Sequence, residues 1–339
     1  MREADRILEA GYVIDGHLDL GLTMEVKYAH GERNVLMHDY YDSLRKGHVD
    51  CVVGALFAET KYLPDHGVRQ LMEQISLIYE EVAASDGHFV IVRNTEEMRQ
   101  VRENGQISIL LAVEGAEALE GKLSILTALY ELGVRIISPC WSRTTWAADG
   151  ARFLPIGGYE GTGLTEQGRE LVKCCENKGI LLDVSHCNLK SFWDISRIAT
   201  KPFVATHSNA YAVSPVDRNL EDDQIRFLAE KGGTMGLNGA STIARYQDPK
   251  QAGMPDLIEH LLHEKQVGGI GCVAIGLDQG NHLNQYVDEL RDMPLFDIIP
   301  SHEMLPDFAE MMLDCGLTED EIRGVFGENL LRVLQETID

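Results

Sequence analysis

The sequence predicts an α/β fold, a single (β/α)8 TIM barrel that forms one domain over residues 1–339. Apolar runs of strand length recur eight times along the chain, and patterns typical of helices separate them. Five of these runs end in a histidine or a carboxylate, and a parallel barrel gathers such side chains at the carboxyl ends of its strands. The length of 339 residues fits one barrel with insertions.

The eight expected strands are short and almost continuously apolar, which is typical of parallel strands covered on both faces. We expect them at residues 12–14, 50–57, 107–113, 134–138, 180–184, 203–205, 233–237 and 273–276. Helical patterns lie between them, at residues 67–84, 95–103, 123–132, 165–178, 189–198, 222–230 and 255–267. Closure into a barrel is the simplest arrangement of these elements, and a doubly wound open sheet is the alternative.

Two long loops interrupt the alternation, near residues 141–163 and 281–306. The first is rich in glycine, and the second precedes a closing helix expected at 306–315. Both follow the carboxyl end of an expected strand. We therefore expect both loops on the active face, where they are candidates for a lid.

The composition argues against two classes of partner. A formal charge of −24 disfavours nucleic acid and anionic membrane surfaces. No apolar run reaches the roughly 18–20 residues of a membrane helix, and the N-terminal segment does not resemble a secretory signal. Seven cysteines, an odd number without a Cys-x-x-Cys motif, indicate reduced thiols in a cytoplasmic protein.

The polar residues at the strand ends are types that bind metals. His17 and Asp19 are two residues apart, so we expect both side chains on one face of the first strand. His186 and His207 end two consecutive strands, which lie roughly 4.8 Å apart in a parallel sheet. Glu114 follows an apolar run, where a carboxylate is costly to bury without a cation. Together these residues could hold two metal ions with Glu114 as the bridge, a centre suited to hydrolysis.

These residues and their neighbours resemble the membrane or renal dipeptidase-like zinc peptidases of the amidohydrolase superfamily. The similar segments follow the family's order through nearly the whole chain. They are residues 15–19 (Asp-Gly-His-Leu-Asp), 114–115 (Glu-Gly), 183–186 (Asp-Val-Ser-His), 206–210 (Thr-His-Ser-Asn-Ala), 218–219 (Arg-Asn), 222–223 (Asp-Asp), 276–278 (Gly-Leu-Asp) and 327–333 (Gly-Glu-Asn-Leu-Leu-Arg-Val). The resemblance implies a barrel of the metal-dependent hydrolase type.

The resemblance also implies a role for each matching residue. One zinc ion would be bound by His17, Asp19 and Glu114. The second zinc ion would be bound by Glu114, His186 and His207. A hydroxide that bridges the two metals would attack the amide carbon. Asp278 would then act as the acid/base that carries the proton to the leaving amine.

The match is weaker on the substrate side. Arg218 corresponds to a residue that would bind a substrate carboxylate through its planar set of donors. The family's histidine after the fourth strand is missing, since no histidine occurs between His88 and His186. Trp141 and Arg143 lie in that segment instead. We expect Arg143 to replace the imidazole and Trp141 to line the pocket or to pack beside it.

The expected function is therefore hydrolysis of the amide bond of a dipeptide or dipeptide-like small molecule with a free carboxylate. Two alternatives remain open. The same metals could serve an enzyme for N-acyl amino acids, lactones or phosphoesters, or the barrel could be a catalytically silent metal-binding scaffold. Other divalent transition metals could replace zinc. The resemblance makes a homodimer possible.

Overall fold

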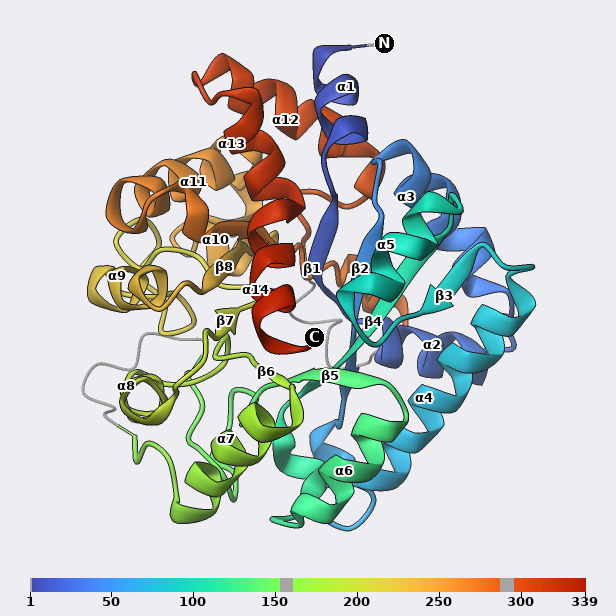
Figure 1. Ribbon diagram of the computed structural model, residues 1–339, viewed down its shortest axis with the longest axis vertical. Helices are drawn as coiled ribbons and strands as arrows, with labels where there is room; N and C mark the ends of the chain where they lie inside the picture. The colour runs from blue at the N-terminus through green and yellow to red at the C-terminus, as the bar shows by residue number, and fades with distance from the viewer. Residues whose placement is uncertain (1, 153–160, 287–295) are drawn as a thin grey trace.

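Parallel strands curl around a common axis, and most of the helices lie outside them (Figure 1). The computed structural model describes residues 2–152, 161–286 and 296–339. One ladder contains β1 (Ile14–Leu18), β2 (Cys51–Phe57), β4 (Ile107–Glu114), β5 (Val134–Ile137) and β6 (Leu181–Leu182), in that order. A second ladder contains β7 (Val204–Ala205), β8 (Thr234–Leu237) and β9 (Val273–Ile275).

Backbone hydrogen bonds connect the two ladders at both of their junctions. The Val184 N–H donates to the Val204 carbonyl at 2.7 Å, beside a parallel bridge between Asp183 and Val204. At the other junction the Asp278 N–H donates to the His17 carbonyl at 3.1 Å. The strands therefore form a curled parallel barrel. The predicted barrel fold is confirmed, and the doubly wound open sheet is wrong.

The α-helices alternate with the strands, as the sequence predicts. They are α1 (Glu3–Ala10), α2 (Leu20–Ala29), α3 (Tyr41–Lys46), α4 (Gly67–Ala84), α5 (Thr95–Glu103), α6 (Leu123–Glu131), α7 (Glu166–Lys178), α8 (Leu189–Ile198), α9 (Asp222–Glu230), α10 (Ser241–Ala244), α11 (Met254–Gly268), α12 (Leu305–Asp314), α13 (Glu319–Arg323) and α14 (Asn329–Thr337). Among the described residues, no helix has both the length and the apolar character that crossing a membrane requires. Of the two long loops, residues 153–160 and 287–295 lie outside the described residues.

Side chains of the strands alternate between two apolar cores. On β2, Cys51 and Val53 belong to an inner cluster, whereas Val52 belongs to the cluster between strands and helices. Leu330, Val333 and other side chains of α14 also join the inner cluster, and α14 crosses the ring of strands (Figure 1). Each buried aliphatic side chain contributes about 1.5–3 kcal/mol. Because α14 fills the amino-terminal end of the barrel, the carboxyl ends of the strands remain for a site.

A β-bulge in β1 determines which way His17 points. Asp15 pairs with Val52 but Leu18 pairs with Gly54, so β1 contains one residue more than β2 over this stretch. Such a bulge reverses the alternation of side chains beyond it. Ile14 accordingly lies in the inner cluster, whereas Leu18, four residues later, lies in the outer one. The same reversal turns His17 toward the barrel axis.

The bulge leaves the Asp15 carboxylate on the opposite side, where it links β1 to β9. It accepts hydrogen bonds from the N–H of Leu277 at 2.9 Å and from the His302 ring at 2.8 Å. Both Asp15 and His302 are buried. This carboxylate therefore helps to close the barrel directly beneath the carboxyl ends of β1 and β9.

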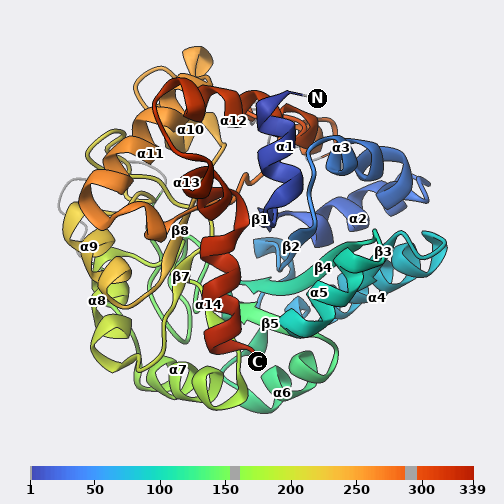
Figure 2. The same ribbon diagram turned by 45° about the horizontal axis from the view of Figure 1, so that its top comes forward.

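The sequence did not predict β3 (Phe89–Ile91). This strand pairs with residues 107–109 of β4, while β5 pairs with residues 111–113. Since β2 occupies the other edge of β4 along residues 108–114, β3 and β5 share one edge. Figure 2 shows β3 at the outer side of the sheet, close to α4 and α5. The strand is an addition outside the barrel.

Candidate metal centre

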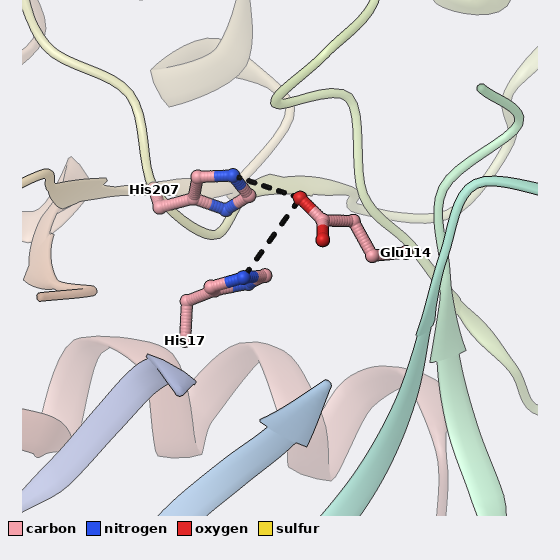
Figure 3. A group of neighbouring side chains, drawn as sticks. All are labelled: His17, Glu114 and His207. Atoms are coloured by element: carbon pink, nitrogen blue, oxygen red, sulfur yellow. Dashed lines mark ion pairs between the residues drawn. The ribbon is translucent and has the colours of Figure 1, made fainter. Parts of the chain in front are cut away.

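Three imidazoles converge on the carboxylate of Glu114, the last residue of β4. The Glu114 Oε1 atom lies 2.7 Å from His186 Nε2, 3.5 Å from His207 Nε2 and 3.9 Å from His17 Nε2. Figure 3 shows His17, from β1, and His207, from the segment that follows β7, pointing at this oxygen. All four side chains are buried. They form the inner half of the candidate site.

A second group shares His17 with the first. His17 Nε2 lies 3.5 Å from an oxygen of Asp19 and 3.9 Å from an oxygen of Asp278. The expectation that Asp19 lies on the strand is wrong, because β1 ends at Leu18 and Asp19 precedes the first turn of α2. Its side chain nevertheless reaches His17. The structure thus brings together the five residues predicted as ligands and Asp278.

Hydroxyl groups form hydrogen bonds with the Nδ1 atoms of His186 and His207. Ser142 Oγ lies 2.8 Å from His186 Nδ1, and Thr206 Oγ1 lies 2.9 Å from His207 Nδ1. The Thr206 hydroxyl donates its proton to Asp183 at 2.6 Å, so it accepts from the His207 ring. The Nε2 atom of His207 consequently carries the lone pair, as a metal ligand requires.

The inner residues fit a metal ion. The Nε2 atom of His17 is buried and has no hydrogen-bond partner among the described residues. Buried polar atoms are nearly always satisfied in folded proteins, and a cation would satisfy this one. Imidazole nitrogens and carboxylate oxygens are the donors that zinc prefers when no thiolate is present. The donor set therefore supports a site for zinc or a similar metal.

The charges of the site are also those of a metal centre. Burial, followed by the nearby charges of Arg218 and His17, lowers the pKa values of His186 and His207 and keeps both rings neutral. Burial raises the pKa values of Glu114 and Asp278. The charge of His17 opposes this shift, and neighbouring carboxylates add to it. Such a concentration of buried carboxylates is stabilised by bound cations.

Gly115, which follows Glu114, adopts a backbone conformation that favours glycine. Gly115 has a φ of +88°, and a Cβ atom at this position would clash with the Glu117 carboxylate. Glu117 in turn accepts hydrogen bonds from the Trp141 N–H at 3.0 Å and from Arg143 Nε at 2.9 Å. The glycine of the Glu-Gly pair is thus explained by the close approach of the buried Glu117 carboxylate.

Trp141 and Arg143 form a wall beside His186. The Trp141 ring lies 5.6 Å from the His186 ring and 5.2 Å from the Phe57 ring, measured between centroids. The Arg143 guanidinium stacks on both Trp141 and Phe57, at 4.9 Å and 5.1 Å. It also donates to the Thr60 hydroxyl and the Ala58 carbonyl. Trp141 therefore lies beside the candidate ligand His186, and Arg143 packs against Trp141.

Arg218 is buried beside the segments that carry His186 and His207. Its guanidinium donates to the carbonyls of Ser185 and His207 and to the Ser208 hydroxyl. Its Nε atom is buried without a partner among the described residues. The position braces the two backbone segments that carry His186 and His207.

Sequence reasoning overlooked Ser142, Thr206 and Asn238 as supports of the site. Asn238 follows β8 directly and donates to Asp278 at 2.9 Å. It obeys the same rule that singled out the ligands, a polar side chain at the carboxyl end of a buried strand. Thr206 likewise follows its strand, β7, directly. Ser142 gives no such signal, because serine is common in loops.

The sequence matches a known protein family over its whole length. The family described as membrane dipeptidase (peptidase family M19) matches residues 1–339. An uncharacterized protein from the pqqA 5' region of Klebsiella pneumoniae is 32% identical over 219 residues, which are 64% of this chain and 81% of that protein.

Two solved structures are similar over almost their full length. Dipeptidase AC, a metallopeptidase of family M19, is 29% identical with a TM-score of 0.85, covering 96% of this chain and 98% of that one. A metallopeptidase from Rhodobacter sphaeroides, solved with a phosphinate mimic of the dipeptide L-Ala-D-Ala, is 28% identical. Its TM-score is 0.84, with 96% of this chain and 99% of that one covered.

Proposed function

Because the chain belongs to the membrane dipeptidase family, peptidase family M19, we propose that it is a dinuclear zinc enzyme that cleaves the amide bond of a dipeptide. Membership makes it a metallo-dipeptidase. The number and identity of the metals and the roles of individual residues are the proposed part. The convergence of His17, His186 and His207 on one oxygen of Glu114 is the observation that carries the proposal.

We assign one metal to His17, Asp19 and Glu114, and the other to Glu114, His186 and His207. Glu114 supports this division because its Oε1 atom lies within 3.9 Å of all three imidazoles. When bound, two zinc ions supply Lewis acidity for the scissile carbonyl and activate water at neutral pH. Manganese, cobalt or iron would suit the same ligands.

Asp278 is assigned the proton transfer. It would accept a proton as the water oxygen bonds to the amide carbon, and return it to the nitrogen when the C–N bond breaks. Three features support this role: its side chain is 23% exposed, it lies 3.9 Å from His17 Nε2, and the partial burial of its carboxylate raises its pKa. Its φ of +53° is unusual for a residue with Cβ, and such conformations cluster at active sites.

The substrate is proposed to be a dipeptide with a free carboxylate. The Rhodobacter sphaeroides relative was solved with a mimic of L-Ala-D-Ala, which favours a D-residue at the C-terminal position. Arg218 is the candidate for the carboxylate, because its Nε atom lacks a partner among the described residues. Trp141 and Arg143 would contact the rest of the substrate beside His186.

One observation favours a second candidate function. Trp141, rather than a histidine, lies next to His186, so the group expected to hold the scissile carbonyl differs from that of the family. Hydrolysis of N-acyl amino acids, lactones or phosphoesters at the same metals is therefore the alternative. A catalytically silent scaffold fits less well, since it has no need of Asp278. The location in the cytoplasm remains a proposal supported by seven free cysteines, and the homodimer remains a prediction.

A substrate panel tests the proposal. Purified protein is loaded with zinc and assayed against dipeptides with L- and D-residues at the C-terminus, N-acyl amino acids, lactones and phosphoesters. We expect dipeptide hydrolysis that Asp278→Asn slows by about 100- to 10,000-fold without loss of zinc. Arg218→Met should raise KM for free dipeptides more than for their C-terminal amides. Activity confined to a lactone or phosphoester would overturn the dipeptide assignment in favour of the alternative.

A further inference from the structure

Asn238 connects the proposed proton carrier to a proposed metal ligand. It follows β8 and is completely buried. Its side-chain nitrogen donates to Asp278 Oδ2 at 2.9 Å and lies 3.3 Å from the backbone carbonyl of His207. One amide group thus contacts both elements of the site.

Neighbouring hydrogen bonds fix the orientation of this amide. The Asn238 Oδ1 atom accepts the backbone N–H of Ala240 at 2.7 Å. Because a backbone N–H can bond only to the oxygen of the amide, the nitrogen must face Asp278. The donor is therefore oriented before any substrate binds.

Two further buried asparagines hold Asn238 in place. The Asn209 side chain accepts the Asn238 N–H at 2.8 Å and donates to the Asn238 carbonyl at 3.0 Å. Asn219 accepts the Asn209 N–H at 3.0 Å and donates to the carbonyls of Ser214 and Ile243. Three amides in series thus connect the protein interior to the Asp278 carboxylate. Such fully satisfied polar networks rigidify a site.

The orientation of the Asp278 carboxylate depends on the hydrogen bond from Asn238. Among the described residues, Asn238 is the side chain that hydrogen-bonds to its carboxylate. The Asp278 backbone is held separately, since its N–H donates to the His17 carbonyl. The backbone bond sets where the residue lies, and the Asn238 bond sets which way the carboxylate turns.

We propose that Asn238 is a positioning residue that orients the Asp278 carboxylate for proton transfer, held by Asn209 and Asn219. The inference rests on the proposed function of Asp278. A fold-stabilising role alone would not require the side-chain nitrogen to contact Asp278, because the reciprocal bonds with Asn209 involve only the backbone of Asn238.

A double-mutant cycle tests this inference in the zinc-loaded, full-length protein. Asn238→Leu removes the donor and keeps a side chain that branches at the same atom. Asn238→Asp retains an acceptor for Ala240 and removes the permanent donor, so it carries the test if the leucine variant fails to fold. We expect either change to lower kcat about 10- to 100-fold, with KM within twofold and zinc content unchanged. In the Asp278→Ala background the same change should have no further effect on kcat.

Independent losses that multiply in the double variant would overturn the proposal, as would a loss of zinc or a rise in KM without a fall in kcat. A crystal structure of the zinc-loaded variant gives a readout that needs no activity. The Asp278 carboxylate should turn away from His17, and an unmoved carboxylate would contradict the role. If the wild type cleaves no dipeptide, the proposed function fails, whereas this structural result still decides the positioning role.

Discussion

The Nε2 atoms of His186 and His207 lie only 2.9 Å apart at the carboxyl end of the barrel. At this distance two imidazoles either share a proton or bind a common cation. Burial lowers the pKa values of both rings, which disfavours the shared proton as a cationic pair. With Glu114 Oε1 2.7 Å from His186, the pair offers the donors that one of the two proposed metal sites requires.

Zinc binding should release protons. Burial alone lowers the pKa of His17, but Glu114, Asp19 and Asp278 outweigh it and raise that pKa to about 10. Because a metal ligand must be a neutral imidazole, zinc has to displace this proton at neutral pH. We expect calorimetric titrations in buffers of different ionisation enthalpy to show release of at least one proton. Affinity should then rise about tenfold per pH unit for each proton released, and pH-independent binding between pH 6 and 8 would contradict this assignment.

Substitution of Glu114 should affect both metals, whereas substitution of Asp19 should affect one. Glu114 contacts all three imidazoles, while Asp19 contacts His17. From about two zinc ions per chain, we expect Asp19→Asn to retain about one and Glu114→Gln to retain fewer than one. Elemental analysis after dialysis measures this. The exposed Asp223→Asn is the matched control and should retain the full content. Equal losses in the two site variants would rule out Glu114 as the bridge.

The grouping of the candidate ligands could be predicted because strand ends obey a simple rule. A buried apolar strand that ends in His17, Glu114 or His207 delivers a polar side chain to one end of the barrel. The direction of His17 could not be predicted in this way, because the bulge in β1 adds a single residue without any signal in the sequence. The strand-face argument for His17 and Asp19 gave the right neighbours for the wrong reason.

The surroundings of the site depend on contacts between distant segments. The orientation of Arg218 follows from the carbonyls of Ser185 and His207, and no local pattern encodes that arrangement. The strand β3 was missed because it lies outside the barrel, beyond the eight strands that the barrel pattern requires. Asn238 is different, since the rule used for the ligands applies to it equally.

Gly115→Ala should destabilise the protein and weaken the metal site. The change forces alanine into a positive φ and places its Cβ against the Glu117 carboxylate. Gly105→Ala is the matched control, because Gly105 has a φ of +71° with no atom near the new Cβ. We expect Gly105→Ala to lower the unfolding free energy by about 1 kcal/mol, which is the cost of a left-handed conformation for a residue with Cβ. Gly115→Ala should lower the unfolding free energy further, because its Cβ also meets the Glu117 carboxylate. Urea unfolding and zinc content measure both, and equal losses with normal zinc content would contradict the close packing at Gly115.

Glu264 should be a site where a substitution stabilises the protein. This residue of α11 is completely buried, and neither carboxylate oxygen has a hydrogen-bond partner among the described residues. Burial raises its pKa well above the ordinary value. The folded state thus binds the Glu264 proton more tightly than the unfolded chain. Its contribution to stability is therefore present below the unfolded-state pKa of about 4.3 and is lost as pH rises above it.

Glu264→Gln removes this pH dependence and keeps the shape of the side chain. We expect little difference from the wild type near pH 4 and a gain that grows by as much as about 1.4 kcal/mol per pH unit above it, until the folded-state pKa is reached. Glu264→Met, which also removes the unsatisfied polar atoms, should be stabilising even at pH 4. Urea unfolding at pH 4, 6 and 8 measures the gain, with the exposed Glu230→Gln as control. A gain that does not change with pH would mean that Glu264 is ionised in the folded protein through a partner that offsets its burial.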